Sequence, residues 1–317
     1  MIKKVATLLL STLFLASCSK EVFTGEIKWV SPLGAPSIAF YDQYDNSNWV
    51  SQAASLMPAE LQGNMYDAVV YDSITGLESI KMNDSDFALA RVITGGNFYL
   101  VGINHTEMPT STSKIVAFQK DKVPDKVFKK VASDRWGLDT SNVKYVKDAS
   151  ETAPILKTGK YQSEDVDYVL TAEPVFSANK SAAQEAGITL TELKVLRDEW
   201  RELTGQNFIV QAGIFVRKSI IDYKKDKLNE WFTRLDTRLE NLISNNPIVG
   251  DEMNEYGDAK RQQARYGVAY PIINVVQKEG ANRLGFVTKA NNEELSVNAF
   301  LTALGLSTYE DSYFAKF

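Results

Sequence analysis

Residues 66–104 read YDAVVYDSITGLESIKMNDSDFALARVITGGNFYLVGIN, and this stretch decides the predicted fold. It contains three short apolar runs, each bounded by small polar residues. The first run ends at Asp72-Ser73, and the second ends at Thr94-Gly95-Gly96-Asn97. Short apolar runs that end in polar loops are typical of buried strands in an α/β sheet. Ligands of open α/β sheets bind at the carboxyl ends of the strands, so we expect this stretch to form one wall of a binding cleft.

The same alternation of strands and helices extends over most of the 317 residues, a length typical of about two domains. A turn-rich segment, Thr106–Ser113, separates a first group of strands from a second group. The restart of the β–α rhythm after it indicates a second α/β domain. We expect Asp67–Tyr71, Phe87–Ile93 and Phe98–Ile103 to complete the first sheet. The other predicted strands are Glu26–Val30, Lys114–Phe118, Val143–Val146, Asp167–Thr171 and Phe208–Val216.

Apolar residues at helical spacing predict several amphipathic helices, whose apolar faces we interpret as core. Thr189-Leu-Thr-Glu192 has the spacing of a capping box and predicts the start of a helix that ends at Gly205. A long helix is expected from Ser219 to Asn246. Two more are expected at Glu252–Tyr266 and Glu293–Leu304.

The N-terminus has the order of a bacterial lipoprotein signal. Lys3 and Lys4 precede an apolar run, Val5–Leu15, which is too short for a stable membrane span. Leu15-Ala16-Ser17-Cys18 resembles a lipobox, which implies cleavage before Cys18 and lipidation of its thiol. We therefore expect a signal peptide over residues 1–17 and a lipidated tether over residues 18–25. An ordinary signal peptide or a signal anchor with an incidental cysteine is the alternative.

The charge balance gives no reason to expect nucleic acid as a partner. Cleavage would remove Lys3 and Lys4, which leaves 33 basic against 40 acidic residues, a net charge of −7. Such a chain is repelled by nucleic acid and by anionic lipid, so the membrane contact would be the lipid on Cys18. Cys18 is the only cysteine, and an intramolecular disulfide is therefore impossible. The predicted location is extracytoplasmic, on a bacterial cell membrane.

Residues for several kinds of chemistry are missing. His105 is the only histidine, so zinc sites built from His and Cys and nucleophiles activated by His are disfavoured. Phosphate-binding and nucleophile-elbow motifs are absent. Carboxylate pairs such as Asp84/Asp86 occur, but no feature of the sequence marks any of them as the acid and base of a glycosidase. We therefore predict no catalytic residues, no metal and no cofactor.

Seven segments, taken in order, resemble solute-binding lipoproteins of ABC importers: GAPSIAF (34–40), YDAVVYDSITG (66–76), RVITGGNFYLVG (91–102), VLTAEPVFSANK (169–180), EWRELTG (199–205), QAGIFVRKS (211–219) and the tail RLGFVTKANNEE…FLTALG (283–305). The most similar group is the NMT1/THI5-like one, related to binding proteins for thiamine-pyrimidine precursors, nitrate, sulfonates and taurine. The resemblance implies the type 2 periplasmic-binding-protein fold, an α/β fold of two Rossmann-like lobes joined by a two-crossover hinge. Lobe one would comprise residues 22–110 and 211–317, and lobe two residues 111–210.

The resemblance also implies where a ligand binds. Carried over position by position, the cleft residues are Gly34, Ala35, Pro36, Ser37, Asp72, Ser73, Thr94, Gly95, Gly96 and Asn97 from lobe one, with Gln119 and Glu173 from lobe two. Residues 34–37 also fit an ordinary connection between a strand and a helix. Gly95 stands where the family carries an aromatic residue, which removes a stacking wall for aromatic ligands.

The resemblance implies a small solute and an ABC permease as partners of a monomeric protein. The carboxylates of Asp72 and Glu173 would suit an amine-bearing or NH-rich, pyrimidine-like solute, with Arg91 or Arg217 available to offset them. On this interpretation, Asp72→Ala and Glu173→Ala weaken binding and leave the stability of the free protein nearly unchanged. A surface lipoprotein acting in adhesion or signalling, or an enzyme on the same fold, is the alternative.

Overall fold

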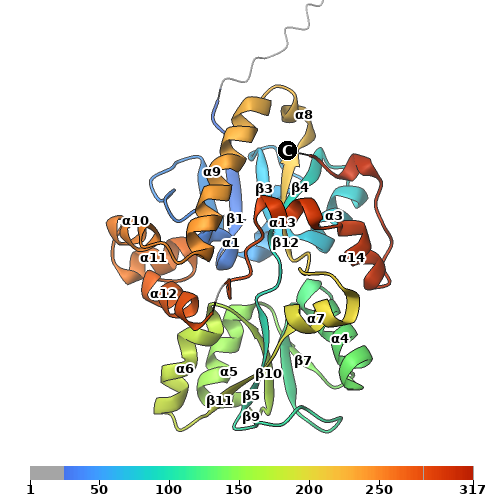
Figure 1. Ribbon diagram of the computed structural model, residues 1–317, viewed down its shortest axis with the longest axis vertical. Coiled ribbons are helices and arrows are strands. Elements are labelled where there is room, and N and C mark those ends of the chain that lie inside the picture. Colours follow the sequence, from blue (N-terminus) through green and yellow to red (C-terminus); the bar gives the residue numbers. More distant parts are fainter. Residues whose placement is uncertain (1–24, 281, 317) are drawn as a thin grey trace, which may run out of the picture.

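The computed structural model describes residues 25–280 and 282–316. The predicted signal peptide, Cys18 and all of the predicted tether except Gly25 lie outside the described residues. Within the described ranges, no helix combines the length and apolar character needed to cross a membrane. The described chain folds into two lobes, one above the other in Figure 1.

The upper lobe, lobe one, is organised around a five-stranded sheet with the order β2-β1-β3-β12-β4. Its strands are β1 (Trp29–Pro32), β2 (Trp49–Gln52), β3 (Ala68–Asp72), β4 (Phe87–Thr94) and β12 (Ala212–Arg217). The pairs of β1 with β2 and β3 are parallel, whereas β12 runs antiparallel to both of its neighbours. Residues of β3 and β12 are almost all buried, because helices cover both faces of the sheet.

Lobe two has a second five-stranded sheet, with the order β11-β5-β10-β6-β7. Its strands are β5 (Phe98–Ile103), β6 (Ile115–Phe118), β7 (Lys144–Val146), β10 (Tyr168–Ala172) and β11 (Leu190–Val195). Here β5 is the single antiparallel strand, paired with β10 and β11. A short hairpin of β8 (Lys160–Tyr161) and β9 (Glu164–Asp165) stands apart from this sheet. The prediction of an α/β fold with two lobes is confirmed, and each lobe has a mostly parallel sheet with one antiparallel strand.

The predicted sheet assignment of Phe98–Ile103 is wrong. This segment is β5 and lies in the sheet of lobe two, where Tyr99 and Leu100 pair with β10. The chain therefore leaves the first sheet between Thr94 and Phe98, and not at the turn-rich segment Thr106–Ser113. It returns between Gly205 and Ala212. Both apolar runs are equally buried, and hydrophobicity alone does not indicate which sheet a strand joins.

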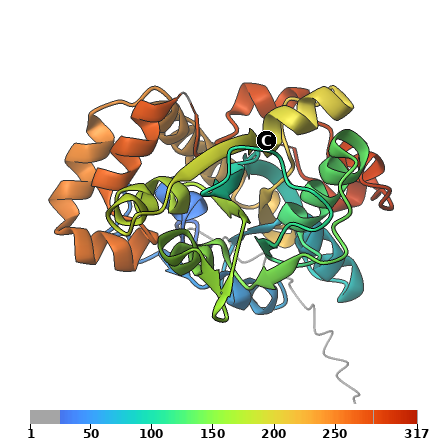
Figure 2. The same ribbon diagram turned by 90° about the horizontal axis from the view of Figure 1, so that it is seen from below.

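Helices cover the sheets of both lobes. Lobe two carries α4 (Val123–Trp136), α5 (Ala153–Thr158), α6 (Val175–Glu185) and α7 (Leu196–Thr204). Lobe one carries α1 (Ala35–Ile38), α2 (Met57–Glu60), α3 (Ser73–Met82), α8 (Lys218–Ile221), α9 (Lys225–Ile243), α10 (Ile248–Tyr256), α11 (Ala259–Tyr266), α12 (Tyr270–Glu279), α13 (Lys289–Glu294) and α14 (Val297–Ala303). Seen from below, α10, α11 and α12 extend to one side of the strands (Figure 2).

Four of the helix predictions need correction. The predicted helix Ser219–Asn246 is two helices, α8 and α9, and the predicted helix Glu293–Leu304 covers the end of α13 and the whole of α14. Leu190–Val195 is the edge strand β11, so the apparent capping box at Thr189 starts no helix. The helix begins only at Leu196, and Gly205 ends it in a left-handed conformation, as predicted. The predicted helix Glu252–Tyr266 is two helices, α10 and α11. Gly257 has φ of 148°, and the Asp258 side chain accepts the Arg261 N–H and so caps a new helix that starts at Ala259. The apolar residues of the segment 190–195 stand at 190, 193 and 195, a spacing that does not by itself separate a strand from a helix.

Candidate functional site

The loop after β1 is closed by contacts within lobe one. Gly34 has φ of 103° and donates its N–H to the Tyr266 carbonyl over 2.9 Å. The Ser37 hydroxyl donates to the Gly34 and Tyr266 carbonyls over 2.9 and 2.7 Å. A Cβ on Gly267 would lie 2.7 Å from the Gly34 nitrogen, so only glycine lets this segment approach so closely. Ala35 and Pro36 continue into α1, and most of the polar groups of this loop are already bonded.

The loop after β3 joins the two lobes. One carboxylate oxygen of Asp72 accepts the Thr75 N–H over 2.9 Å and caps α3. The other oxygen accepts the N–H of Val123, the first residue of α4 in lobe two, over 3.2 Å. The Ser73 N–H donates to the Gln211 carbonyl over 3.0 Å, and its hydroxyl donates to the Val210 carbonyl. Burial of the Asp72 carboxyl raises its pKa, while the N–H donors and the nearby Lys122 act to lower it.

Lys122 makes a second contact between the two lobes, next to Asp72. Its ammonium donates to the Tyr71 hydroxyl over 2.6 Å and lies 4.9 Å from the centre of that ring. Tyr71 belongs to lobe one and Lys122 to lobe two. Burial raises the pKa of Tyr71, although the hydrogen bond from Lys122 acts to lower it. The sequence showed Lys122 only as part of a polar segment, without a signal for this contact.

Thr94–Asn97 is the first crossover between the lobes. Gly95 donates its N–H to the Gly285 carbonyl over 2.6 Å and accepts from the Ile209 N–H over 3.0 Å. A Cβ on Gly95 would come within 2.6 Å of Val287 and 2.7 Å of Phe208. The Phe208 ring therefore lies where a side chain at position 95 would begin. The buried Thr94 hydroxyl has no hydrogen-bond partner among the described residues.

Asn97 ties the two crossovers to lobe two. Its carbonyl accepts the Glu173 N–H over 3.0 Å, and its side-chain amide donates to the Glu173 carbonyl. Gln211, on the second crossover, donates to the Asn97 side chain over 2.9 Å and accepts the Gly96 N–H over 3.0 Å. Gln211 lay at an expected crossover but was not a predicted site residue. Its amide links both crossovers into one polar unit.

The two predicted residues of lobe two differ in their surroundings. Gln119 is half-buried, and its amide donates to Asp148 within the same lobe over 3.3 Å. The Glu173 side chain is fully buried, and it caps α6 by accepting the Ser177 N–H over 3.0 Å. It also accepts the Ser177 hydroxyl over 2.7 Å and the Arg283 guanidinium over 3.0 Å. Glu173 thus has few free acceptor positions for a solute.

Arg283 is the centre of a second group of contacts between the lobes. It belongs to the segment after α12 in lobe one, and it pairs with Glu173 and Glu192 of lobe two over 3.0 and 2.6 Å. Its guanidinium lies 4.5 Å from the centre of the Tyr99 ring. Burial acts against its charge, yet hydrogen bonds to Glu192 and Glu173 hold the pKa of Arg283 above its ordinary value. The sequence showed this residue only as the first of the RLGFVTKANNEE segment.

The structure therefore brings together two groups of the predicted residues. Asp72 and Ser73 lie against the start of α4 and the second crossover, and Asn97 lies against Glu173. Gly34–Ser37 packs on Tyr266, and Gln119 bonds within its own lobe. Arg91 and Arg217, expected as possible counter-charges, are used elsewhere: Arg91 pairs with Asp236 over 2.7 Å, and Arg217 donates to the Gly63 and Tyr66 carbonyls.

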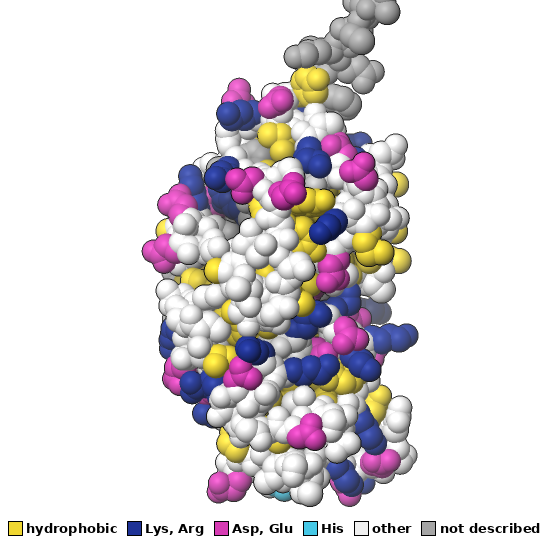
Figure 3. Space-filling view, turned by 90° about the vertical axis from the view of Figure 1, so that its right-hand side faces the viewer, with side chains coloured by type: hydrophobic (Ala, Val, Ile, Leu, Met, Phe, Trp, Pro, Cys, Tyr) yellow, Lys and Arg dark blue, Asp and Glu magenta, His cyan; other side chains and the backbone are white. Residues whose placement is uncertain are grey.

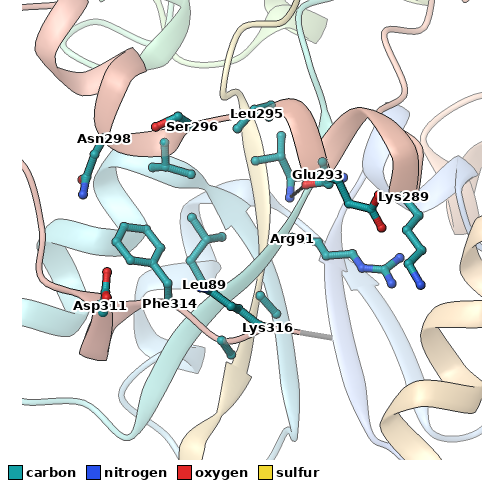
Figure 4. A pocket seen from close by; sticks show the side chains of 15 residues that line it. Leu89, Arg91, Lys289, Glu293, Leu295, Ser296, Asn298, Asp311, Phe314 and Lys316 are labelled. Carbon is teal, nitrogen blue, oxygen red and sulfur yellow. Dashed lines mark hydrogen bonds between the residues drawn. The ribbon is translucent and has the colours of Figure 1, made fainter.

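Cavities also occur away from these loops. One of about 500 Å³ lies on lobe one, between β4, α13, α14 and the C-terminal segment (Figure 4). Arg91, Lys289 and Glu293 lie at one end of it, and Asp311 and Asn298 at the other. A second cavity of about 500 Å³ lies on lobe two near Ser111–Val116. None of the predicted site residues lines either cavity. Among the described residues, no group of acidic side chains and histidine could hold a metal ion.

The strand orders of the two sheets and the two crossovers that join them identify the fold. The chain has the periplasmic-binding-protein fold. An ABC transporter protein from Parabacteroides distasonis is similar over 91% of this chain and 95% of its own, with a TM-score of 0.60 and 18% identity. The periplasmic aliphatic sulphonate binding protein SsuA from Escherichia coli is similar over 89% and 86%, with a TM-score of 0.59 and 11% identity.

A third similar structure is the alkanesulfonate-binding protein SsuA from Xanthomonas axonopodis, bound to MOPS. It matches over 91% of this chain and 98% of its own, with a TM-score of 0.57 and 11% identity. No family model matches the chain, and no curated protein does. At such low identities, the similarity shows the fold and leaves the ligand to be argued from this chain's own residues.

Proposed function

We propose that the protein is an extracytoplasmic, lipid-anchored solute-binding protein that captures a small metabolite between its lobes and delivers it to the permease of an ABC importer. Similar structures that share its fold include binding proteins of ABC importers, which supports this role. The sequence resemblance to importer lipoproteins, including the NMT1/THI5-like group, supports it independently.

One observation carries this proposal. The loops at the ends of β3 and β4 face the loops at the ends of β6 and β10 in the other lobe. Contacts between them are polar, as in Asp72 to Val123 and Tyr71 to Lys122. Polar contacts of this kind are readily exchanged for contacts with water or a solute. Two lobes that meet through such contacts and are joined by two adjacent crossovers can separate and close around a ligand.

We propose the cleft loops 34–37, 72–73 and 94–97, together with Gln119 and Glu173, as the walls of the solute site. With the strand 98–103 assigned to lobe two, lobe one would comprise residues 22–97 and 211–317, in place of the expected 22–110 and 211–317, and lobe two residues 98–210. The solute would be an amine-bearing or NH-rich molecule, such as a pyrimidine. The half-buried Asp72 and Gln119 are the side chains best placed to accept its N–H groups.

A screen of small metabolites tests the proposed function. Amines, pyrimidines, amino acids and sulfonates would be added to the purified mature protein, and any molecule that copurifies would be identified by mass spectrometry. A true solute at 100 times its Kd should raise the free energy of unfolding by about 2.7 kcal/mol, seen as a higher Tm. His105→Ala, at the far end of lobe two, is the control and should bind like the wild type. Absence of any stabilising solute would contradict the proposal, and steady turnover of one would indicate an enzyme.

The anchor has its own test. Full-length protein produced in a bacterium should be found in the membrane fraction, with a lipid mass on the N-terminal residue Cys18. Cys18→Ala should keep the uncleaved signal peptide and lose the lipid, because only the thiol can accept it. A Ser19→Ala variant is the matched control and should be lipidated normally. Unmodified Cys18 in a wild-type protein that is cleaved elsewhere would show an ordinary secretory signal.

A further inference from the structure

The most unusual contact of the cleft is a single carboxylate that caps two helices from different lobes. Asp72 accepts the Thr75 N–H of α3 with one oxygen and the Val123 N–H of α4 with the other. Helices α3 and α4 have 10 and 14 residues, and the positive end of each dipole is directed at this carboxylate. Lys122 is the N-cap residue of α4, but its side chain makes no capping hydrogen bond to the N–H groups of that helix. The carboxylate that caps α4 therefore comes from lobe one.

The surroundings of this carboxylate are positive. Burial raises the pKa of Asp72, and the nearby Lys122 ammonium, like the two helix ends, opposes this shift by favouring the carboxylate form. Asp125 is an acidic residue in the first turn of α4. Its negative charge is balanced locally, because its carboxylate accepts from the Lys129 ammonium over 2.8 Å and from the Tyr145 hydroxyl over 2.8 Å. On the face shown in Figure 3, Lys and Arg side chains gather at mid-height with Asp and Glu among them. The local positive charge around Asp72 thus arises from α3, α4 and Lys122.

Resting on the proposed function, we propose that Asp72 determines the class of solute that the cleft accepts. Its carboxylate occupies the position between α3 and α4 that an anionic group of a solute would otherwise take. A sulfonate, phosphate or carboxylate would have to displace a covalently attached anion from the same N–H donors. The solute is therefore neutral or cationic at this end, and the interlobe bond of Asp72 closes the lobes without a bound anion.

Removing the Asp72 carboxylate tests the proposal. Asp72→Ser keeps a good cap for α3, because serine is a favoured N-cap, but its short side chain no longer reaches Val123. Sulfate and methanesulfonate are the probes, measured by calorimetry at low ionic strength. Asp72→Ser should bind them at least tenfold more tightly than the wild type does, and added sodium chloride should weaken this binding.

Two variants distinguish the effect of freeing the space between α3 and α4 from the effect of removing the negative charge of Asp72. Asp72→Asn is neutral but fills the same space, so it should gain little anion binding. Asp72→Ser combined with Lys122→Met should lose most of the gain, because one of the positive groups is gone. If a folded Asp72→Ser protein binds sulfate no better than the wild type, or if Asp72→Asn gains as much, the proposal is overturned. The probes are simple anions, so the result does not depend on finding the natural solute.

Discussion

Replacing Glu173 by alanine should lower the free energy of unfolding by about 3–5 kcal/mol. The Glu173 side chain is fully buried, and the side chain of its partner Arg283 is only 12% exposed. Removing the carboxylate leaves a buried guanidinium with one acid fewer and removes the cap from the Ser177 N–H of α6. Chemical denaturation of the mature protein, followed by circular dichroism, measures this difference.

Glu192→Ala is the matched control, because Glu192 pairs with the same guanidinium but is 31% exposed. This exposed partner should contribute about 1 kcal/mol or less. Glu173→Ala combined with Arg283→Met should recover part of the loss, since no buried charge is then left without its partner. Equal costs at both glutamates would contradict the central position of Glu173. The expectation from the sequence alone, a nearly unchanged stability, is thereby replaced.

Gly95→Trp should destabilise the protein by about 3 kcal/mol, even though the family that the chain resembles carries an aromatic residue there. A Cβ at this position would already lie 2.6 Å from Val287 and 2.7 Å from Phe208, and the indole has no space beyond them. The backbone of Gly95 is held on both sides, by Gly285 and by Ile209, so it cannot move aside easily. Thermal and chemical unfolding measure the cost.

A second substitution tests whether Phe208 has taken the aromatic's place. Phe208→Ala in the Gly95→Trp background should restore much of the lost stability, because the new ring can enter the space that Phe208 leaves. Phe208→Ala alone should be destabilising, since it leaves a cavity between the crossovers. If the double variant is as unstable as the sum of the single variants, Phe208 and position 95 do not share this space.

The sequence was sufficient to predict the two α/β lobes, because apolar strands and polar loops alternate with a clear rhythm. It could not place β5, because a buried strand fits either sheet equally well and only the pairing of Tyr99 with Thr171 decides. The predicted cleft loops lie at or next to the ends of strands, and the order of apolar and polar residues along the chain is enough to locate strand ends. Their partners were missed because Lys122, Gln211 and Arg283 act across long sequence separations. Such contacts leave no periodic signal in the chain.

The pairing of Thr94 with Ala212 has a consequence for how lobe two is attached. These residues end β4 and begin β12, and they lie opposite each other in antiparallel strands. Lobe two is thus an insertion at the tip of a β-hairpin, with its two ends side by side. A two-residue turn such as Asn-Gly could close the same hairpin in its absence. Lobe one is therefore continuous in space across the insertion, and a foreign domain whose ends lie close together could be grafted at this point.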